Sequence, residues 1–336
     1  MRVRKCVTAG RRLVAVYTRR DRNQVYGYGV RNCREASDRL KTTMNAQLPS
    51  VGLLHPLPGN LRVPVDFSVV IPTFRRVDQL RECIASVIAQ TGVTTEIFVI
   101  DDSPEGSAQP VVEHFADGRI SYVKNPQPTG GRPSVVRNLG WPLATGSFVH
   151  FLDDDDIVAD GHYAAVKSAF ESYPDVGQVF GRIEPFGSGP ATQLDHEHRY
   201  FADAARKAAA CARFGNWWAY TAMMLFDSAL LVCSASIVRR ACVGALQGFD
   251  PEIRLMEDAD FHVRVMREFG AHFLNRTAIR YRIGSPSLMH SPNPLPSQRE
   301  EEMGGCRRMQ AKYRSRHGLL EYYALRVFTG AVRKML

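Results

Sequence analysis

The chain lacks the features that define membrane-spanning and disulfide-rich secreted proteins. No apolar stretch reaches the roughly 18 uncharged residues that a transmembrane helix needs, and the best candidate, residues 221–237, is interrupted by Asp227. The first residues are basic, but no continuous apolar segment follows them, so a secretory signal is not expected. The seven cysteines are odd in number and form no C-x-x-C pair. Neither a disulfide framework nor a zinc site is therefore predicted, and a reducing, cytoplasmic compartment is favoured.

An excess of positive charge is confined to the two ends of the chain. Residues 1–63 hold 13 Lys and Arg against 3 Asp and Glu, and residues 299–336 hold 9 against 4. Residues 48–64 are rich in Pro and Gly, which is typical of a linker. We therefore expect a basic N-terminal extension and linker over residues 1–63, a domain over 64–290 and a basic helical segment over 291–336. The extension is either a poorly ordered tail or a contact to the inner face of an anionic membrane, and no nucleic acid is expected.

Short apolar runs alternate with helical patterns in the central part of the chain. The expected strands cover residues 67–71, 96–100, 120–123 and 148–152. Between the first two, Leu80, Ile84 and Val87 recur at helical spacing after Asp78, a suitable N-cap residue. This alternation predicts an α/β fold, in which a Rossmann-like, mostly parallel mixed sheet is flanked by helices. Such sheets bind ligands beyond the carboxyl ends of their strands.

Polar residues follow three of the predicted strands. The segment Pro72-Thr73-Phe74-Arg75 ends the first strand, Asp101-Asp102 the second, and the four aspartates Asp153–Asp156 the last. Adjacent carboxylates repel one another and raise each other's pKa unless a cation neutralises them. Mg²⁺ and Mn²⁺ prefer carboxylate oxygens and often bridge them to phosphates. The run therefore predicts a metal–diphosphate site, with a solvated acidic loop as the alternative.

Six segments of the chain form a recognisable series. They are FSVVIPTFRR (67–76), EIFVIDDS (96–103), VVRNLGWPLATGSFVHFLDDDD (135–156), SASIVRR (234–240), GFDPEI (248–253) and MEDADFHVRV (256–265). In this order they resemble the motifs of family 2 glycosyltransferases with the GT-A fold, and the resemblance covers about residues 65–290. The resemblance implies transfer of a sugar from a nucleotide diphosphate sugar to an acceptor hydroxyl, with inversion. Residues 64–156 would bind the donor and 157–290 a carbohydrate or lipid-linked acceptor, in surface polysaccharide or glycolipid synthesis.

The resemblance also implies roles for individual residues on the donor side. The donor-binding residues would be Pro72, Thr73, Phe74, Arg75, Asp102, Arg137, Asp153 and Asp154. Among these, Asp102 would accept a hydrogen bond from the base, and Arg137 either contacts the donor or forms a structural salt bridge. Asp155 and Asp153 would bind Mg²⁺ or Mn²⁺. Asp156 either belongs to this set or caps the following helix.

On the acceptor side, Asp258 matches the general base of the family, which deprotonates the attacking hydroxyl. Glu257 matches the neighbour that orients the base or touches the acceptor. Alternatively, these acidic residues and Asp260 only favour the first turn of a helix through its macrodipole. The family often has Tyr-Arg-x-His near the metal, whereas this chain has Tyr281-Arg282-Ile283-Gly284. The missing histidine motivates a rival function as a non-catalytic nucleotide-sugar-binding subunit of a larger synthase. A nucleotidyltransferase of similar architecture is a second rival.

Overall fold

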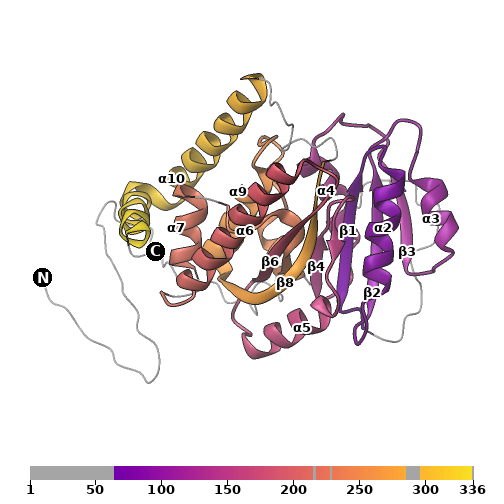
Figure 1. Ribbon diagram of the computed structural model, residues 1–336, viewed down its shortest axis with the longest axis horizontal. Coiled ribbons are helices and arrows are strands. Elements are labelled where there is room, and N and C mark those ends of the chain that lie inside the picture. The colour runs from indigo at the N-terminus through magenta and orange to yellow at the C-terminus, as the bar shows by residue number, and fades with distance from the viewer. Residues whose placement is uncertain (1–63, 215–216, 228, 285–295, 335–336) are drawn as a thin grey trace, which may run out of the picture. The chain divides into compact units, whose positions relative to one another are not determined.

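The computed structural model describes residues 64–214, 217–227, 229–284 and 296–334 (Figure 1). The strands are β1 (Phe67–Thr73), β2 (Thr95–Asp101), β3 (Ile120–Lys124), β4 (Phe148–Phe151), β5 (Ile157–Val158), β6 (Gln178–Gly187), β7 (Ser236–Arg239) and β8 (Ala271–Ile283). The helices are α2 (Val77–Ile88), α3 (Gln109–Phe115), α4 (Pro133–Gly140), α5 (His162–Ser172), α6 (Ala191–Cys211), α7 (Trp218–Phe226), α8 (Arg240–Leu246), α9 (Glu257–Phe269) and α10 (Pro296–Arg333). The extension predicted for residues 1–63 lies outside the described residues.

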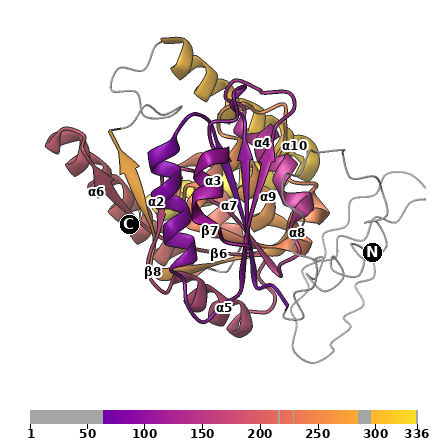
Figure 2. The same cartoon turned by 90° about the vertical axis from the view of Figure 1, so that its right-hand side faces the viewer.

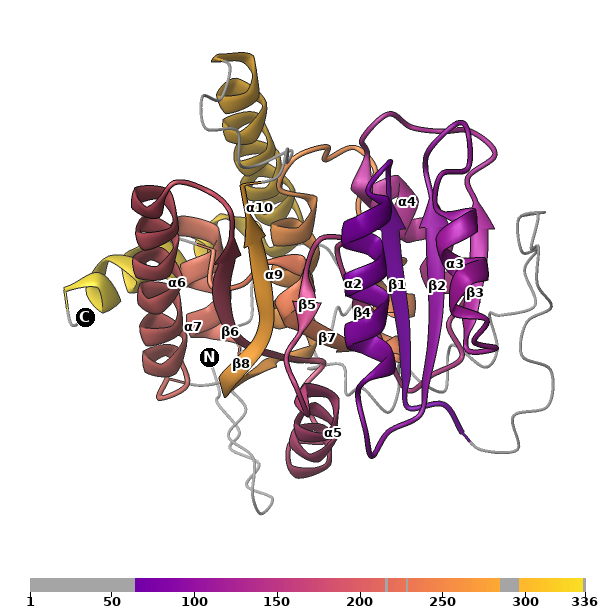
Figure 3. The same cartoon turned by 45° about the vertical axis from the view of Figure 1, so that its right-hand side comes forward.

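The described strands form one eight-stranded sheet in the order β3-β2-β1-β4-β7-β6-β8-β5. Strand β1 pairs in parallel with β2 and β4, and β2 pairs in parallel with β3. Strand β7 is antiparallel to both β4 and β6, whereas β6 and β8 are parallel. The predicted α/β fold with a mostly parallel mixed sheet is confirmed. In the view of Figure 3, β1, β2 and β3 stand side by side, next to α2.

Both faces of the central strand β1 are buried, which explains its continuous apolar sequence. Phe67, Val69 and Ile71 pack in one cluster with residues of α2 and α5. Val70 points to the other face and packs with residues of α4, α8 and α9. Figure 2 shows α2 and α4 on opposite sides of the sheet. The two helix layers hold the strand ends in fixed positions.

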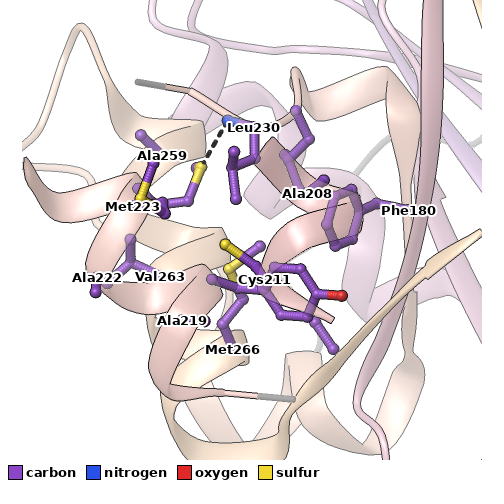
Figure 4. Close-up of a cluster of buried hydrophobic side chains, with 14 of the residues drawn as sticks. Phe180, Ala208, Cys211, Ala219, Ala222, Met223, Leu230, Ala259, Val263 and Met266 are labelled. Carbon is purple, nitrogen blue, oxygen red and sulfur yellow. Dashed lines mark hydrogen bonds between the residues drawn. The ribbon is translucent and has the colours of Figure 1, made fainter. Parts of the chain in front are cut away.

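A third hydrophobic cluster holds α9 in place beside β6, α6 and α7. Ala259, Val263 and Met266 of α9 are buried together with Phe180 of β6 and Met223 of α7 (Figure 4). The spacing of these three residues places them on one side of α9, while Phe261 and Val265 are buried in the cluster on its other side. This packing fixes the start of α9, where Glu257 and Asp258 lie.

Neither of the two residues considered as helix caps, Asp78 and Asp156, has that role. The α2 helix begins at Val77 without a side-chain cap, and Asp78 instead pairs with Arg81 at 3.2 Å. Asp156 caps no helix, because the short strand β5 follows it and α5 begins only at His162. The buried Asp156 carboxylate accepts a hydrogen bond from the backbone N–H of Arg282 at 3.3 Å. In both cases tertiary contacts override the local capping preference.

Candidate active site

The ends of β1, β2 and β4 meet at one edge of the sheet because these strands run in parallel. The backbone N–H of Asp102 donates to the carbonyl of Thr73 at 2.9 Å, and that of Leu152 donates to Val70 at 3.0 Å. Asp153 follows Leu152 directly. The polar segments after the three strands, which are far apart in sequence, therefore lie side by side as predicted from the strand pattern.

Three arginines from different elements contact the run of aspartates. Arg76 Nη1 lies 3.0 Å from Asp154 Oδ1 and 2.6 Å from Asp155 Oδ2. Arg137 Nη2, on α4, lies 2.6 Å from Asp153 Oδ1. Arg282 Nε, on β8, donates to the Asp155 carbonyl at 2.9 Å. The run is therefore not a solvated loop; it is a largely buried acidic cluster surrounded by guanidinium groups.

Burial dominates the electrostatics of this cluster. It raises the pKa of Asp154 to about 7, while the Arg76 guanidinium opposes the rise. Burial also raises the pKa of Asp155, and that of Asp156 well above its usual range, with neighbouring aspartates adding to the effect in each case. The arginines thus only partly neutralise the aspartates, and a further cation would stabilise their ionised forms.

The carboxylates at the start of α9 are joined to the aspartate run through Arg137. Arg137 Nη1 lies 2.8 Å from Glu257 Oε1, and the arginine side chain is almost fully buried. Burial and the Asp258 charge raise the pKa of Glu257 to about 7, although Arg137 opposes this. Burial also raises the pKa of Asp258, whose Oδ1 accepts the Ala259 N–H at 2.7 Å. The structural salt bridge expected as one alternative for Arg137 is present.

Asp260, the third acidic residue of this helical turn, lies outside the site. Its carboxylate forms a buried ion pair with Arg264, 2.7 Å from Nε, four residues further along α9. Asp101 is likewise structural: its carboxylate accepts hydrogen bonds from Ser103, the Ala108 N–H and the Tyr122 hydroxyl. Both residues therefore serve the fold.

Asp102 fixes the loop that follows β3. It accepts hydrogen bonds from Asn125 Nδ2 at 2.6 Å and from the Thr129 N–H and hydroxyl at 2.9 and 2.7 Å. These partners satisfy much of its carboxylate, so its predicted contact to a nucleotide base stays a prediction. In the structure, Asp102 connects β2 to the loop over residues 125–129.

The predicted donor-binding residues at the end of β1 and just after it differ in exposure. Thr73 is buried and Pro72 is half-buried, whereas Phe74 is exposed. Arg75 adopts a positive φ of 58° and pairs with Glu105 at 2.6 Å on the surface. Its guanidinium also lies over the Phe74 ring, 5.1 Å from the centroid. The arginine that contacts the aspartates is therefore the next residue, Arg76, for which no role was predicted.

The donor atoms of the aspartate run fit a hard divalent cation, although no ready cage is formed. Within the described parts of the chain, no group of three or more His, Cys, Asp or Glu side chains is arranged to hold a metal. Asp154 Oδ1 and Asp155 Oδ2 instead converge on one nitrogen of Arg76. Two carboxylate oxygens that meet at a single positive centre are the donor type that Mg²⁺ and Mn²⁺ prefer.

The position where the family often has a histidine has no room for a side chain. Gly284 has a φ of 93°, and a Cβ there would lie 2.7 Å from the Gly189 backbone nitrogen. A glycine is needed at this close approach of two chain segments. His290, the next histidine in the sequence, lies outside the described residues.

The sheet, the aspartate run at its edge and the acidic start of α9 define a GT-A type domain. Residues 68–230 match the family model "Glycosyl transferase family 2". Over these residues, just under half of its length, the chain is similar to glycosyltransferase family 2. Over 74% of its length it is similar to 67% of Staphylococcus aureus TarS 1–349 in complex with UDP-GlcNAc, with a TM-score of 0.55 and 18% identity. That likeness shows the fold alone.

Two curated relatives illustrate the sequence similarity. The Campylobacter jejuni GalNAc(5)-diNAcBac-PP-undecaprenol beta-1,3-glucosyltransferase is 37% identical over 141 residues, which are 39% of this chain and 44% of that protein. The Escherichia coli glycosyltransferase YibD is 33% identical over 112 residues, 33% of this chain and 32% of that protein. The chain thus spans less than half the length of these relatives. No helix in the described ranges is long and apolar enough to cross a bilayer.

Proposed function

We propose that this protein is a metal-dependent, inverting glycosyltransferase that moves a sugar from a nucleoside diphosphate sugar to an acceptor hydroxyl. The observation that carries the proposal is the double ion pair of Arg137, with Asp153 at 2.6 Å and Glu257 at 2.8 Å. Arg137 links the carboxylate proposed to help bind the leaving group to the pair of carboxylates proposed to act on the acceptor. A structural acidic loop and an unrelated acidic helix turn would not need a shared buried guanidinium.

The comparisons support the substrate classes. TarS was solved with UDP-GlcNAc, and the Campylobacter relative is named for a polyprenyl diphosphate acceptor. We infer a nucleoside diphosphate sugar as donor and a carbohydrate or lipid-linked acceptor in surface polysaccharide or glycolipid assembly. The enzyme would then work in the cytoplasm, at the inner face of the membrane.

On the donor side, Pro72, Thr73 and Phe74 line the base and ribose, and Asp102 supports the adjoining loop. Mg²⁺ or Mn²⁺ held by Asp155 and Asp153 would supply Lewis-acid stabilisation of the diphosphate leaving group. Arg76 and Arg282 already lie against the aspartate run and add positive charge where the leaving group develops negative charge.

On the acceptor side, Asp258 removes the proton from the hydroxyl as its oxygen attacks the anomeric carbon opposite the diphosphate. Its pKa is raised by burial, which brings the carboxylate closer to the pKa of an effective base at neutral pH. Glu257 is held by Arg137 and fixes the start of α9 beside the aspartate run. A single displacement, with attack from the face opposite the leaving group, inverts the configuration at the anomeric carbon.

The test is a donor panel. The protein is incubated with Mn²⁺, an acceptor extract and uridine, guanosine and thymidine diphosphate sugars, and released nucleoside diphosphate is measured. Asp258→Asn should retain donor binding and lose transfer by about 10²-fold or more. Asp203→Asn, on the exposed side of α6, is the matched control and should keep full activity.

The remaining outcomes separate the rival functions. Donor binding without release from any nucleotide sugar would contradict the proposal and favour a non-catalytic subunit. Pyrophosphate release from a nucleoside triphosphate and a sugar phosphate would favour a nucleotidyltransferase. Unchanged transfer by Asp258→Asn would remove Asp258 from the role of base.

A further inference from the structure

The α10 helix consists of two segments that meet at Gly318. This residue has φ 83° and ψ 163°, which is not helical, so the segment 296–317 ends there and a second segment, 319–333, begins. A left-handed φ of this kind favours glycine. The two segments can therefore present different faces to their surroundings.

One side of the second segment is fixed to the domain. Tyr322, Leu325, Thr329 and Val332 are buried. The Thr329 hydroxyl lies 3.1 Å from the Ala222 carbonyl of α7, to which it can donate. These four residues are spaced by three and four, which places them on one helix side. Figure 1 shows this part of α10 next to α7.

The opposite side of the same segment carries large apolar residues in solvent. Leu319, Leu320, Tyr323 and Val327 are 60%, 76%, 52% and 74% exposed. Their spacing by three and four residues makes one continuous strip, which we call the outer strip. Single exposed apolar residues are ordinary, but four aligned on one helix side mark a binding surface.

The charges around the outer strip have one sign. Arg326 is exposed on the same segment, and Lys334, which directly follows the segment, is exposed as well. The one acidic residue from 318 to 334 is Glu321, and its carboxylate is paired with Arg267 of α9 at 2.6 Å. Arg314 and Arg316, just before the kink, are exposed as well. The strip is therefore apolar at its centre and basic at its margins.

We propose that the outer strip docks onto the surface of an anionic lipid bilayer. A helix with an apolar side and flanking Lys and Arg lies in the interface, with its apolar side chains among the acyl chains and its cations at anionic headgroups. A second copy of this chain fits less well, since like charges would face each other. Four side chains also fall short of the roughly 1,000 Å² that a stable protein interface buries.

Docking in this way would orient the acceptor half of the site. The first segment of α10 contacts the loop that precedes α9, where Arg308 Nη1 donates to the Glu252 carbonyl at 3.1 Å. One helix thus connects the outer strip to the residues just before Glu257. Membrane docking is separate from the transfer reaction. Because vesicle binding is measured without donor or acceptor, docking can fail while transfer holds, and transfer can fail while docking holds.

The experiment is co-sedimentation of the full chain with vesicles. One set contains phosphatidylcholine alone, and the other contains phosphatidylcholine and phosphatidylglycerol in equal amounts. Binding is expected to the anionic vesicles only, and it should weaken as salt is raised. The double variant Leu320→Gln/Val327→Gln should reduce binding by about tenfold or more, because both side chains are largely exposed on the outer strip.

Two further variants make the test specific. Arg326→Gln should reduce binding by about fivefold through the lost headgroup attraction. Tyr173→Gln, an exposed aromatic at the end of α5, is the control and should bind like the natural chain. Equal binding by the Leu320→Gln/Val327→Gln variant would overturn the proposal, since the basic residues 1–63 would then suffice. A self-association that this variant abolishes, without vesicle binding by the natural chain, would also overturn it.

Discussion

Arg137 and Glu257, which are 120 residues apart in sequence, form an ion pair with 2.8 Å between Nη1 and Oε1. The same guanidinium holds Asp153 through Nη2 at 2.6 Å, and the arginine side chain is 4% exposed. A buried cation between two carboxylates fixes the distance between the strand edge and the start of α9. The site is therefore held together by one residue as well as by the sheet.

Replacing this cation should unfold the domain more easily. Arg137→Met keeps much of the side-chain volume but leaves Asp153 and Glu257 without their partner, so the free energy of unfolding should fall by about 3–5 kcal/mol. Urea denaturation measures the change. Arg206→Met, an exposed residue of α6, is the control and should change stability by less than about 0.5 kcal/mol. A loss below about 1 kcal/mol for Arg137→Met would contradict the structural importance of the pair.

The strand edge of the site could be predicted from sequence because local patterns determine it. Short apolar runs followed by polar residues indicate strand ends, and parallel pairing brings such ends to one edge. Thr73, Asp102 and Asp153 lie at that edge as expected. The acidic pair after Met256 was found by resemblance, since its distance from the aspartates depends on packing between α4 and α9.

The cations of the site could not be predicted in the same way. Arg76 approaches the aspartates from the turn before α2 and Arg282 from β8, and no spacing in the sequence relates them to the run. Arg75 has the same side chain as Arg76 but points to Glu105, because its positive φ turns the chain there. Adjacent identical residues thus have different partners, which only the tertiary structure decides.

The transfer rate should rise with pH through neutrality. Burial raises the pKa of Asp258, and burial together with the Asp258 charge raises that of Glu257 to about 7. The base acts when deprotonated, so the rate should fall as pH drops through the raised pKa values. Glu257→Gln removes a negative charge next to Asp258, so the acid limb should move to lower pH. Initial rates of nucleoside diphosphate release from about pH 5 to 9 test this.

The control for this experiment lies on the same helix. Glu268→Gln, in the last turn of α9 and away from Arg137, should leave the acid limb where it is. An acid limb that Glu257→Gln does not shift would show that the carboxylate pair does not set the pH profile.

A buried histidine should make the fold sensitive to acid. His162 is fully buried, neither ring nitrogen has a hydrogen-bond partner, and burial lowers its pKa to about 3. Below the unfolded pKa of about 6.5 the unfolded chain gains a proton that the folded chain does not, so stability is lost as pH falls, by up to about 1.4 kcal/mol per pH unit. His162→Leu should remove this contribution.

Comparison of His162→Leu with the natural chain separates the contribution of His162 to the pH dependence of stability from that of the other titrating groups. Urea denaturation at several pH values should give a smaller loss of stability on acidification for His162→Leu than for the natural chain. The variant should also be at least as stable at neutral pH, because it removes two unsatisfied polar atoms. Parallel pH curves for the two proteins would contradict the prediction.

Two adjacent glycines of α10 provide a matched pair for the contact between this helix and the active-site loop. A Cβ at Gly305 would overlap the carbonyl oxygen of Leu255, whereas a Cβ at Gly304 would meet no atom within 4 Å. Gly304→Ala should therefore be neutral or stabilise the helix by up to about 1 kcal/mol. Gly305→Ala should cost about 1–3 kcal/mol because the helix must move away from the loop.

The effect on activity distinguishes a local from a functional contact. Leu255 lies two residues before Glu257, and Met256 has a φ of 68° at the start of α9. A displaced α10 would shift this turn and with it Asp258, so Gly305→Ala should lower the transfer rate while donor binding, measured by calorimetry, stays close to that of the natural chain. Equal transfer rates for the two alanine variants, at temperatures where both are folded, would show that the position of α10 does not determine that of the base.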